Sequence, residues 1–97
     1  MEVHFRSRRL QRCAESTAQA IRTWGSDVGV RYVQRLEALV TAPNLDAIYA
    51  TRAFDFHPLT GNRAGQHALR LTGQMRMIVT VEDERTIWIE EVVDYHG

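Results

Sequence analysis

The spacing of apolar side chains changes halfway along the chain and divides it into a helical part and a sheet part. A short alternation over residues 2–6 predicts an N-terminal strand. Apolar side chains then recur every three or four positions over 8–24, where Ser7 is a suitable N-cap and Gly25 ends the predicted helix. The same spacing predicts a second helix over 27–42. Because the link between the two helices is so short, we expect an antiparallel helical hairpin.

The second half of the chain alternates with a period of two, as β-strands do. A single helical turn over 45–49 precedes this part. The predicted strands cover residues 54–58, 67–72, 75–81 and 86–93. Short turns join the last three strands, which predicts an antiparallel meander. This segregation of helices and strands indicates an α+β fold in one domain, 1–97, with one sheet face on the helix pair and the other free for function.

The composition is that of an ordinary globular protein, with 44% hydrophobic and 25% charged residues. It excludes a disordered, collagen-like or coiled-coil chain. No stretch approaches the roughly 20 apolar residues of a membrane-spanning helix, and the first thirty residues lack the apolar segment of a signal peptide. We therefore expect a cytoplasmic protein that contacts no membrane. Cys13, the only cysteine, lies among apolar neighbours and is expected to be a buried, unreactive thiol.

The charges of the chain sum to zero but are unevenly distributed. All twelve basic residues are arginines, and without lysine a phosphate-binding loop of the GxxxxGK[ST] type is excluded. Residues 1–35 and 52–76 carry net positive charge, whereas 77–97 carries six acidic side chains and one arginine. This balance argues against binding of duplex DNA by bulk charge alone. It is compatible with a basic face that contacts nucleic acid, since guanidinium groups bind phosphate in a bidentate manner.

The residues available for chemistry lie on the predicted sheet. The histidines and the cysteine show no spacing typical of a metal site, so we expect neither a metal ion nor another cofactor. His57 lies at a strand end, Arg76 alternates with core residues on a central strand, and the last strand is followed by Asp94, Tyr95 and His96. Because a meander can bring the ends of its first and last strands together, these side chains can meet on the open sheet face.

Such a group of side chains suits cleavage of an RNA phosphodiester bond without a metal. A base must remove the proton of the 2′-OH, a cation must stabilise the charge on the phosphorane, and an acid must protonate the leaving 5′-oxygen. Imidazole supplies acid or base near neutral pH, and arginine supplies a fixed positive charge. Each side chain also has a structural explanation, such as pairing of Arg76 with Glu90 or Glu91 across the sheet.

Three segments resemble the HigB toxins of the RelE/ParE superfamily of type II toxin–antitoxin systems. They are the loop H-P-L-T-G-N-R-A-G over 57–65, Arg76 on the next-to-last strand, and D-Y-H at 94–96. The resemblance covers about residues 54–96 in motif and the whole chain in architecture. It implies a RelE-like fold and a ribosome-dependent endoribonuclease. Such toxins cleave the mRNA codon in the ribosomal A site by metal-independent attack of the 2′-OH.

The resemblance also implies roles for individual residues. His57 matches the family's loop histidine, and Arg76 matches the arginine that faces the scissile phosphate. Asp94, Tyr95 and His96 match the C-terminal catalytic cluster. The order in which the two histidines act as base and acid stays open.

Four further positions bear on how RNA is bound. Arg63 and Arg70 are the expected RNA-binding residues, and for Arg63 a structural role is the alternative. The sequence departs from some relatives at Thr60, where they carry lysine, and at Met75, where they carry tryptophan. These departures remove one cation and one stacking surface from the implied site.

The implied partners are a cognate helix-turn-helix antitoxin of the HigA type and the 70S ribosome with its mRNA. Operator DNA would be reached only through the antitoxin. Two other functions stay open at this point. One is poisoning of gyrase by a ParE-like toxin, which the terminal D-Y-H disfavours. The other is a non-catalytic toxin relic that binds RNA or the ribosome.

Overall fold

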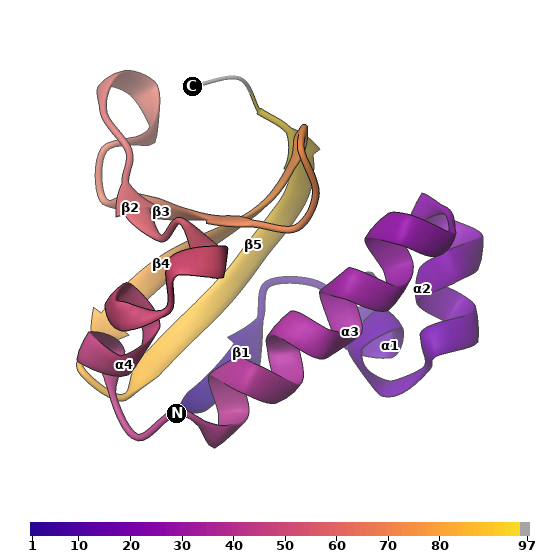
Figure 1. The fold of residues 1–97 in the computed structure, drawn as a ribbon, viewed down its shortest axis with the longest axis horizontal. Helices are drawn as coiled ribbons and strands as arrows, with labels where there is room; N and C mark the ends of the chain where they lie inside the picture. Colours follow the sequence, from indigo (N-terminus) through magenta and orange to yellow (C-terminus); the bar gives the residue numbers. More distant parts are fainter. Residues whose placement is uncertain (96–97) are drawn as a thin grey trace.

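The computed structural model describes residues 1–95 and confirms the α+β fold class (Figure 1). None of the described helices is long and apolar enough to cross a membrane. The helical elements are α1 (Arg8–Glu15), α2 (Thr17–Trp24), α3 (Ser26–Thr41), α4 (Leu45–Ala50) and the 3₁₀ turns η1 (Arg52–Phe54) and η2 (Gly61–Arg63). The strands are β1 (Glu2–Phe5), β2 (His57–Pro58), β3 (Gln66–Arg70), β4 (Met75–Asp83) and β5 (Thr86–Asp94).

The strands form one sheet in the order β1-β5-β4-β3-β2. β3, β4 and β5 are antiparallel neighbours, so the predicted meander is confirmed. β1 lies at the edge and runs parallel to β5, with Val3 opposite Ile87. The sheet is therefore mixed, because the long connection through the helices and the other strands returns to β5 in the direction of β1.

The first predicted helix is two helices, which corrects the expectation of a simple helical hairpin. Ser16 has extended backbone angles and separates α1 from α2. Its hydroxyl accepts a hydrogen bond from the Gln19 amide at 3.2 Å and so caps the new helix. A serine side chain can replace a helical backbone bond in this way. The spacing of apolar residues continues across Ser16, so this spacing did not reveal the break between the two helices. The turn predicted over 45–49 is confirmed as α4.

The strand predicted over 54–58 is mostly a turn. Phe54 and Phe56 are both buried, as their alternation indicated, but Phe54 ends η1 and Asp55 has a left-handed backbone conformation with φ of 45°. Only His57 and Pro58 pair with β3. Proline cannot donate a ladder hydrogen bond, which is consistent with so short an edge strand.

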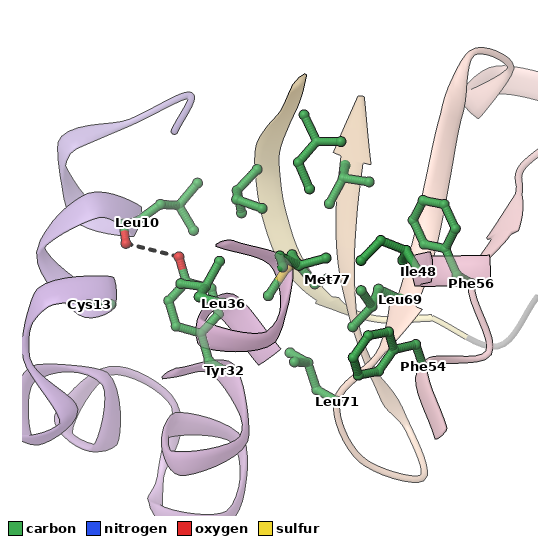
Figure 2. Close-up of a cluster of buried hydrophobic side chains, with 14 of the residues drawn as sticks. Leu10, Cys13, Tyr32, Leu36, Ile48, Phe54, Phe56, Leu69, Leu71 and Met77 are labelled. Atoms are coloured by element: carbon green, nitrogen blue, oxygen red, sulfur yellow. Dashed lines mark hydrogen bonds between the residues drawn. The ribbon is translucent and has the colours of Figure 1, made fainter. Parts of the chain in front are cut away.

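The main core lies between one face of the sheet and the helices (Figure 2). Its largest fully buried side chains include Tyr32 and Leu39 of α3 and Leu69 and Met77 of the sheet. The Tyr32 hydroxyl donates to the Leu10 carbonyl at 2.9 Å and joins α3 to α1. Burial raises the pKa of Tyr32 above its ordinary value, so the hydroxyl remains a donor. The core also includes Cys13, which is fully buried as predicted.

The second face of the sheet is less open than the sequence indicated. Leu59, Ala68 and Ile78 form a second, smaller core on this face, against which Val93 and Tyr95 pack. The loop after β2 therefore covers part of the sheet. At the end of this face near the β3–β4 turn, Arg70 is exposed and Arg76 is partly exposed.

Helices α2 and α3 are in close backbone contact at Gly29. A Cβ atom on Gly29 would lie 2.6 Å from the Ile21 amide nitrogen and 2.7 Å from the Ala20 carbonyl carbon. Both are backbone atoms, which cannot rotate away. The absence of a side chain at this position is therefore required for the observed packing of the two helices.

We predict that Gly29→Ala destabilises the protein, although alanine favours a helix by about 1 kcal/mol over glycine. Overpacking costs about 1–3 kcal/mol in tight cores, and here the two helix backbones must separate. Gly73→Ala is the matched control, since a Cβ there would meet no atom within 4 Å. Urea denaturation of both variants measures the difference. A Gly29→Ala protein as stable as the control would contradict the close approach.

Candidate functional site

His57 is oriented by the backbone of the residue two positions before it. Its Nδ1 lies 2.6 Å from the Asp55 carbonyl oxygen and 4.0 Å from an oxygen of the Asp55 carboxylate. A carbonyl only accepts hydrogen bonds, so Nδ1 carries the proton and donates it. In the neutral ring, Nε2 is then the unprotonated nitrogen. The imidazole side chain is 42% exposed, so this nitrogen can act as a base toward a molecule on the sheet face.

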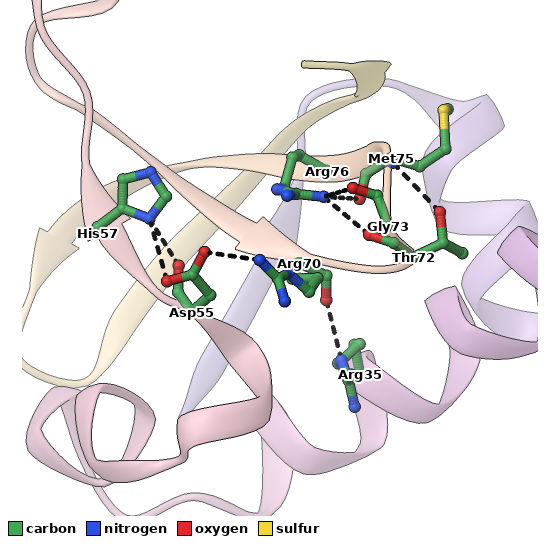
Figure 3. Close-up of polar contacts among 8 residues, drawn as sticks. All are labelled: Arg35, Asp55, His57, Arg70, Thr72, Gly73, Met75 and Arg76. Atoms are coloured by element: carbon green, nitrogen blue, oxygen red, sulfur yellow. Dashed lines mark hydrogen bonds and ion pairs between the residues drawn. The ribbon is translucent and has the colours of Figure 1, made fainter. Parts of the chain in front are cut away.

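Arg70 links the His57 turn to the helical part of the protein (Figure 3). Its Nη2 lies 3.3 Å from the Asp55 carboxylate, and its carbonyl accepts a hydrogen bond from Nε of Arg35 at 3.0 Å. Both charged side chains of the Arg70–Asp55 pair are about half exposed, and pairs of this kind contribute less than about 1 kcal/mol to stability. The pair therefore serves more to place a cation near His57 than to stabilise the fold.

Arg76 is fixed by the turn between β3 and β4. Its Nη1 donates to the carbonyls of Thr72, Met75 and Gly73 at 2.8, 3.0 and 3.3 Å. Within residues 1–95, no hydrogen bond or ion pair is found for its other guanidinium nitrogens. They are available to an anion. The β3–β4 register places Arg76 directly opposite Arg70, so two cations lie on one face at the same end of the sheet.

The C-terminal residues divide between the two sides of β5. Tyr95 packs on the second core, and its amide donates to the Gln74 carbonyl at 3.1 Å, beside the β3–β4 turn. Asp94 lies opposite Met75 in the register. Because side chains alternate between the two faces of a strand, Asp94 lies on the face of the sheet opposite to that of Arg76. His96 lies outside the described residues. The structure thus brings His57, Arg70, Arg76 and Tyr95 to one end of one face.

Arg63 has a structural contact that accounts for its position. Its Nη1 lies 3.1 Å from the Glu91 carboxylate and 3.2 Å from the Gln66 side-chain oxygen. This bond joins the loop after β2 to the last strand. The structural alternative considered for Arg63 is thus the better supported one.

Sequence reasoning missed Asp55 and Arg35. Asp55 acts through its carbonyl and its left-handed backbone, and neither leaves a clear sequence signal beyond an aspartate two residues before a histidine. Arg35 is 35 residues from Arg70 in the chain. A neighbour so distant can be found only from the fold.

These groups provide the elements of phosphodiester chemistry, a base in His57 and fixed cations in Arg70 and Arg76. In residues 1–95, no group of three or more histidine, cysteine or acidic side chains is placed to bind a metal ion. His57 together with Arg70 and Arg76 can perform acid–base catalysis with charge stabilisation by arginine.

A second histidine lies on the helix-covered side of the same strands. The Tyr49 hydroxyl is 2.7 Å from Nε2 of His67, and the His67 ring stacks on Phe56 with centroids 4.8 Å apart. The His67 Nδ1 is buried without a hydrogen-bond partner among the described residues. Burial, and secondarily the proximity of His57, lowers the pKa of His67 below 6.5.

No protein-family model and no curated protein matches this sequence. Solved structures do share its fold. A chain of the YoeB–YefM complex from Staphylococcus aureus has a TM-score of 0.61 at 15% identity, over 100% of this chain and 98% of that chain. YafQ from E. coli strain BL21(DE3) has a TM-score of 0.58 at 14% identity, over 96% of this chain and 91% of that chain.

A further solved structure is described as a YoeB/ParE toxin from Agrobacterium tumefaciens. Its TM-score is 0.58 at 15% identity, over 99% of this chain and 100% of that chain. At such identities the likeness establishes the fold alone. The expectation of a RelE-like α+β fold is confirmed, and these structures do not distinguish a HigB-type protein from others that share the fold.

The lowered pKa of His67 predicts a loss of stability as the pH falls. Below pH 6.5 the unfolded chain binds a proton on this ring that the folded protein does not, so the free energy of unfolding decreases as pH falls from 6.5 toward the folded-state pKa. His67→Gln removes this titration and is expected to flatten the decline. Urea denaturation at intervals from pH 7 to 5.5 measures it. The lowered pKa values of Asp83 and Glu90 change the free energy of unfolding only below this pH range. Equal slopes in the two proteins would contradict the assignment.

Proposed function

We propose that this protein is the toxin of a type II toxin–antitoxin system. Its activity is that of a ribosome-dependent endoribonuclease of the HigB type. It cleaves mRNA in the A site, where the 2′-OH attacks the adjacent phosphate and the 5′-oxygen leaves. No metal takes part in this reaction.

The orientation of His57 is the observation that carries the proposal. A histidine whose Nδ1 proton is bound by a carbonyl at 2.6 Å presents Nε2 as a base. It does so on the sheet face that also carries Arg70 and Arg76, opposite each other in the register. A base beside two cations is what removal of a 2′-OH proton and stabilisation of a phosphorane require.

Each site residue has a role in this proposal. His57 and His96 exchange the protons, and His57 is the better-supported base because its Nδ1 faces the Asp55 carbonyl and leaves Nε2 for the substrate. Arg76 stabilises the charge on the phosphate. Tyr95 stacks on a nucleotide or forms a hydrogen bond to it. The role proposed for Asp94, to orient a histidine or to contact the RNA, has the least structural support, because the register places it on the side of the sheet opposite to that of Arg76.

The partners follow from the same proposal. One of the structures that share this fold is a complex of YoeB with YefM, which supports an antitoxin partner for this chain as well. For a HigB-type toxin, this partner is a helix-turn-helix protein of the HigA type that also binds operator DNA. The ribosome and mRNA place the protein in the cytoplasm, with no membrane contact.

The first test is induction of the protein in cells without an antitoxin, followed by primer extension on an abundant translated mRNA. We expect growth arrest and cuts within codons in the reading frame. The double variant His57→Ala/His96→Ala is expected to relieve the arrest and to abolish the cuts, since each acid–base group contributes about 10²–10⁴-fold to the rate.

The outcome of this experiment separates the other functions of the fold. Arrest with intact mRNA and damaged DNA would contradict nuclease activity and favour a gyrase-directed toxin. Arrest that persists in the double variant would contradict the histidine assignment. No arrest and no cuts would favour a non-catalytic relic, and the first residue to replace would then be Thr60.

Arg76 offers an independent test of charge stabilisation. Arg76→Ala is expected to lower the cleavage rate by about 10²–10³-fold, as the loss of one donor to a developing oxyanion does. The cleavage rate of Arg76→Lys is expected to lie between those of Arg76→Ala and the wild type, because one ammonium cannot contact the three turn carbonyls and also present planar donors to a phosphate. A reconstituted translation system measures the rates, and thermal unfolding shows whether the β3–β4 turn is intact. Full activity of a folded Arg76→Ala protein would exclude this role.

A further inference from the structure

A groove of about 860 Å³ separates the first half of α3 from the end of β3 and the β3–β4 turn. Three arginines line it, Arg31 and Arg35 from α3 and Arg70 from β3. The acidic residue among its lining is Asp27, at the start of α3. The groove therefore carries an excess of positive charge in a protein whose total charge is zero.

The two arginines of α3 have no acidic partner in the described part of the chain. Among residues 1–95, no carboxylate lies within ion-pair distance of Arg31 or Arg35. Arg35 is half-buried, lies over the Phe54 ring with its Cζ 5.0 Å from the centroid, and uses Nε for the Arg70 carbonyl. Burial, and then the proximity of Arg31, lowers the pKa of Arg35. Two guanidinium groups that repel each other are stabilised by an anion bound between them.

The groove is continuous with the candidate site. Arg70 lines the groove, and its guanidinium contacts Asp55 beside His57. Thr72 and Gly73 line it too, and their carbonyls bind Arg76. Figure 3 shows Arg35 on α3 below Arg70, with Asp55 and His57 on one side and Arg76 on the other. A polynucleotide that places one phosphate at Arg76 can therefore continue past Arg70 into the groove.

We propose that this groove binds a backbone phosphate of RNA through Arg31 and Arg35, separate from the phosphate that is cleaved. The identity of the ligand rests on the proposed function, whereas the site itself rests on the lining and charge of the groove. Contacts to phosphate determine register and orientation and carry no base preference. The groove thus positions the RNA strand and does not select the codon.

Arg31 is the residue to replace, because it is exposed and has no bond that supports the fold in the described part of the chain. Two probes are used, a fluorescent single-stranded RNA with 2′-O-methyl riboses, which cannot be cleaved, and 70S ribosomes without mRNA. Dissociation constants are measured over a range of salt concentrations. Loss of one phosphate contact on single-stranded RNA is expected to reduce the slope of log K against log salt by about 0.7.

We expect Arg31→Gln to weaken binding several-fold and to reduce the salt slope, and Arg31→Lys to retain most of both. Arg85→Gln, which removes one exposed arginine from the β4–β5 turn, is the control and is expected to bind as the wild type does. An effect on the oligonucleotide assigns the phosphate to mRNA, and an effect on ribosomes alone assigns it to ribosomal RNA. Unchanged binding of Arg31→Gln to both probes, or an equal loss in Arg85→Gln, would overturn the proposal.

The cleavage assay distinguishes failure of the groove from failure of the proposed function. If the wild type does not cleave mRNA but binds RNA in an Arg31-dependent manner, the nuclease proposal fails and the groove stands. If the wild type cleaves and Arg31→Gln binds and cleaves as well as it does, the groove proposal alone is overturned.

Discussion

The pairing of β4 between β3 and β5 is the constraint on which both faces of the sheet depend. Side chains alternate along a strand, so Met77 and Val79 enter the main core while Arg76 and Ile78 lie on the other side. A shift of the register by one residue would expose the two core residues and bury Arg76. Burial of the core therefore determines the side on which the site cation lies, and Arg70 opposite it follows from the same register.

The second core helps to determine the position of His57. β2 is only two residues long and pairs with β3 through His57 opposite Ala68, which is too little to define its position alone. The chain after it is anchored by Leu59 in the second core and by the Arg63–Glu91 ion pair at 3.1 Å. The chain before it turns at Asp55. A structural arginine and a buried leucine thus place the histidine, and the loop motif of the sequence combines residues of both kinds.

Periodicity predicted the parts of the fold that depend on one buried face. The strands β3, β4 and β5 and the helix over most of 26–41 follow from it. It did not reveal the break at Ser16, because a capping hydroxyl competes with the helix locally while the apolar spacing continues. The alternation of the buried Phe54 and Phe56 also predicted a strand, although a turn buries these two side chains equally well. In the site, the alternation of apolar residues predicted the face of the sheet on which Arg76 lies. The tautomer of His57 could not be predicted, because it depends on a backbone carbonyl and every residue has one.

A protein without net charge can bind RNA only if its charges are separated in space. β4 carries Arg76 near one end and Asp83 at the other, and at about 3.3 Å per residue the strand places them roughly 23 Å apart. Attraction between exposed charges is screened over about 8 Å at physiological salt. The acids of the β4–β5 turn therefore do not cancel the field of the arginines at the other end. Glu90, on the other hand, is bonded to Arg6 at 2.9 Å, so this acid within the sheet is neutralised locally. The arginines near the β3–β4 turn are left to attract a phosphate, whatever the total charge of the chain.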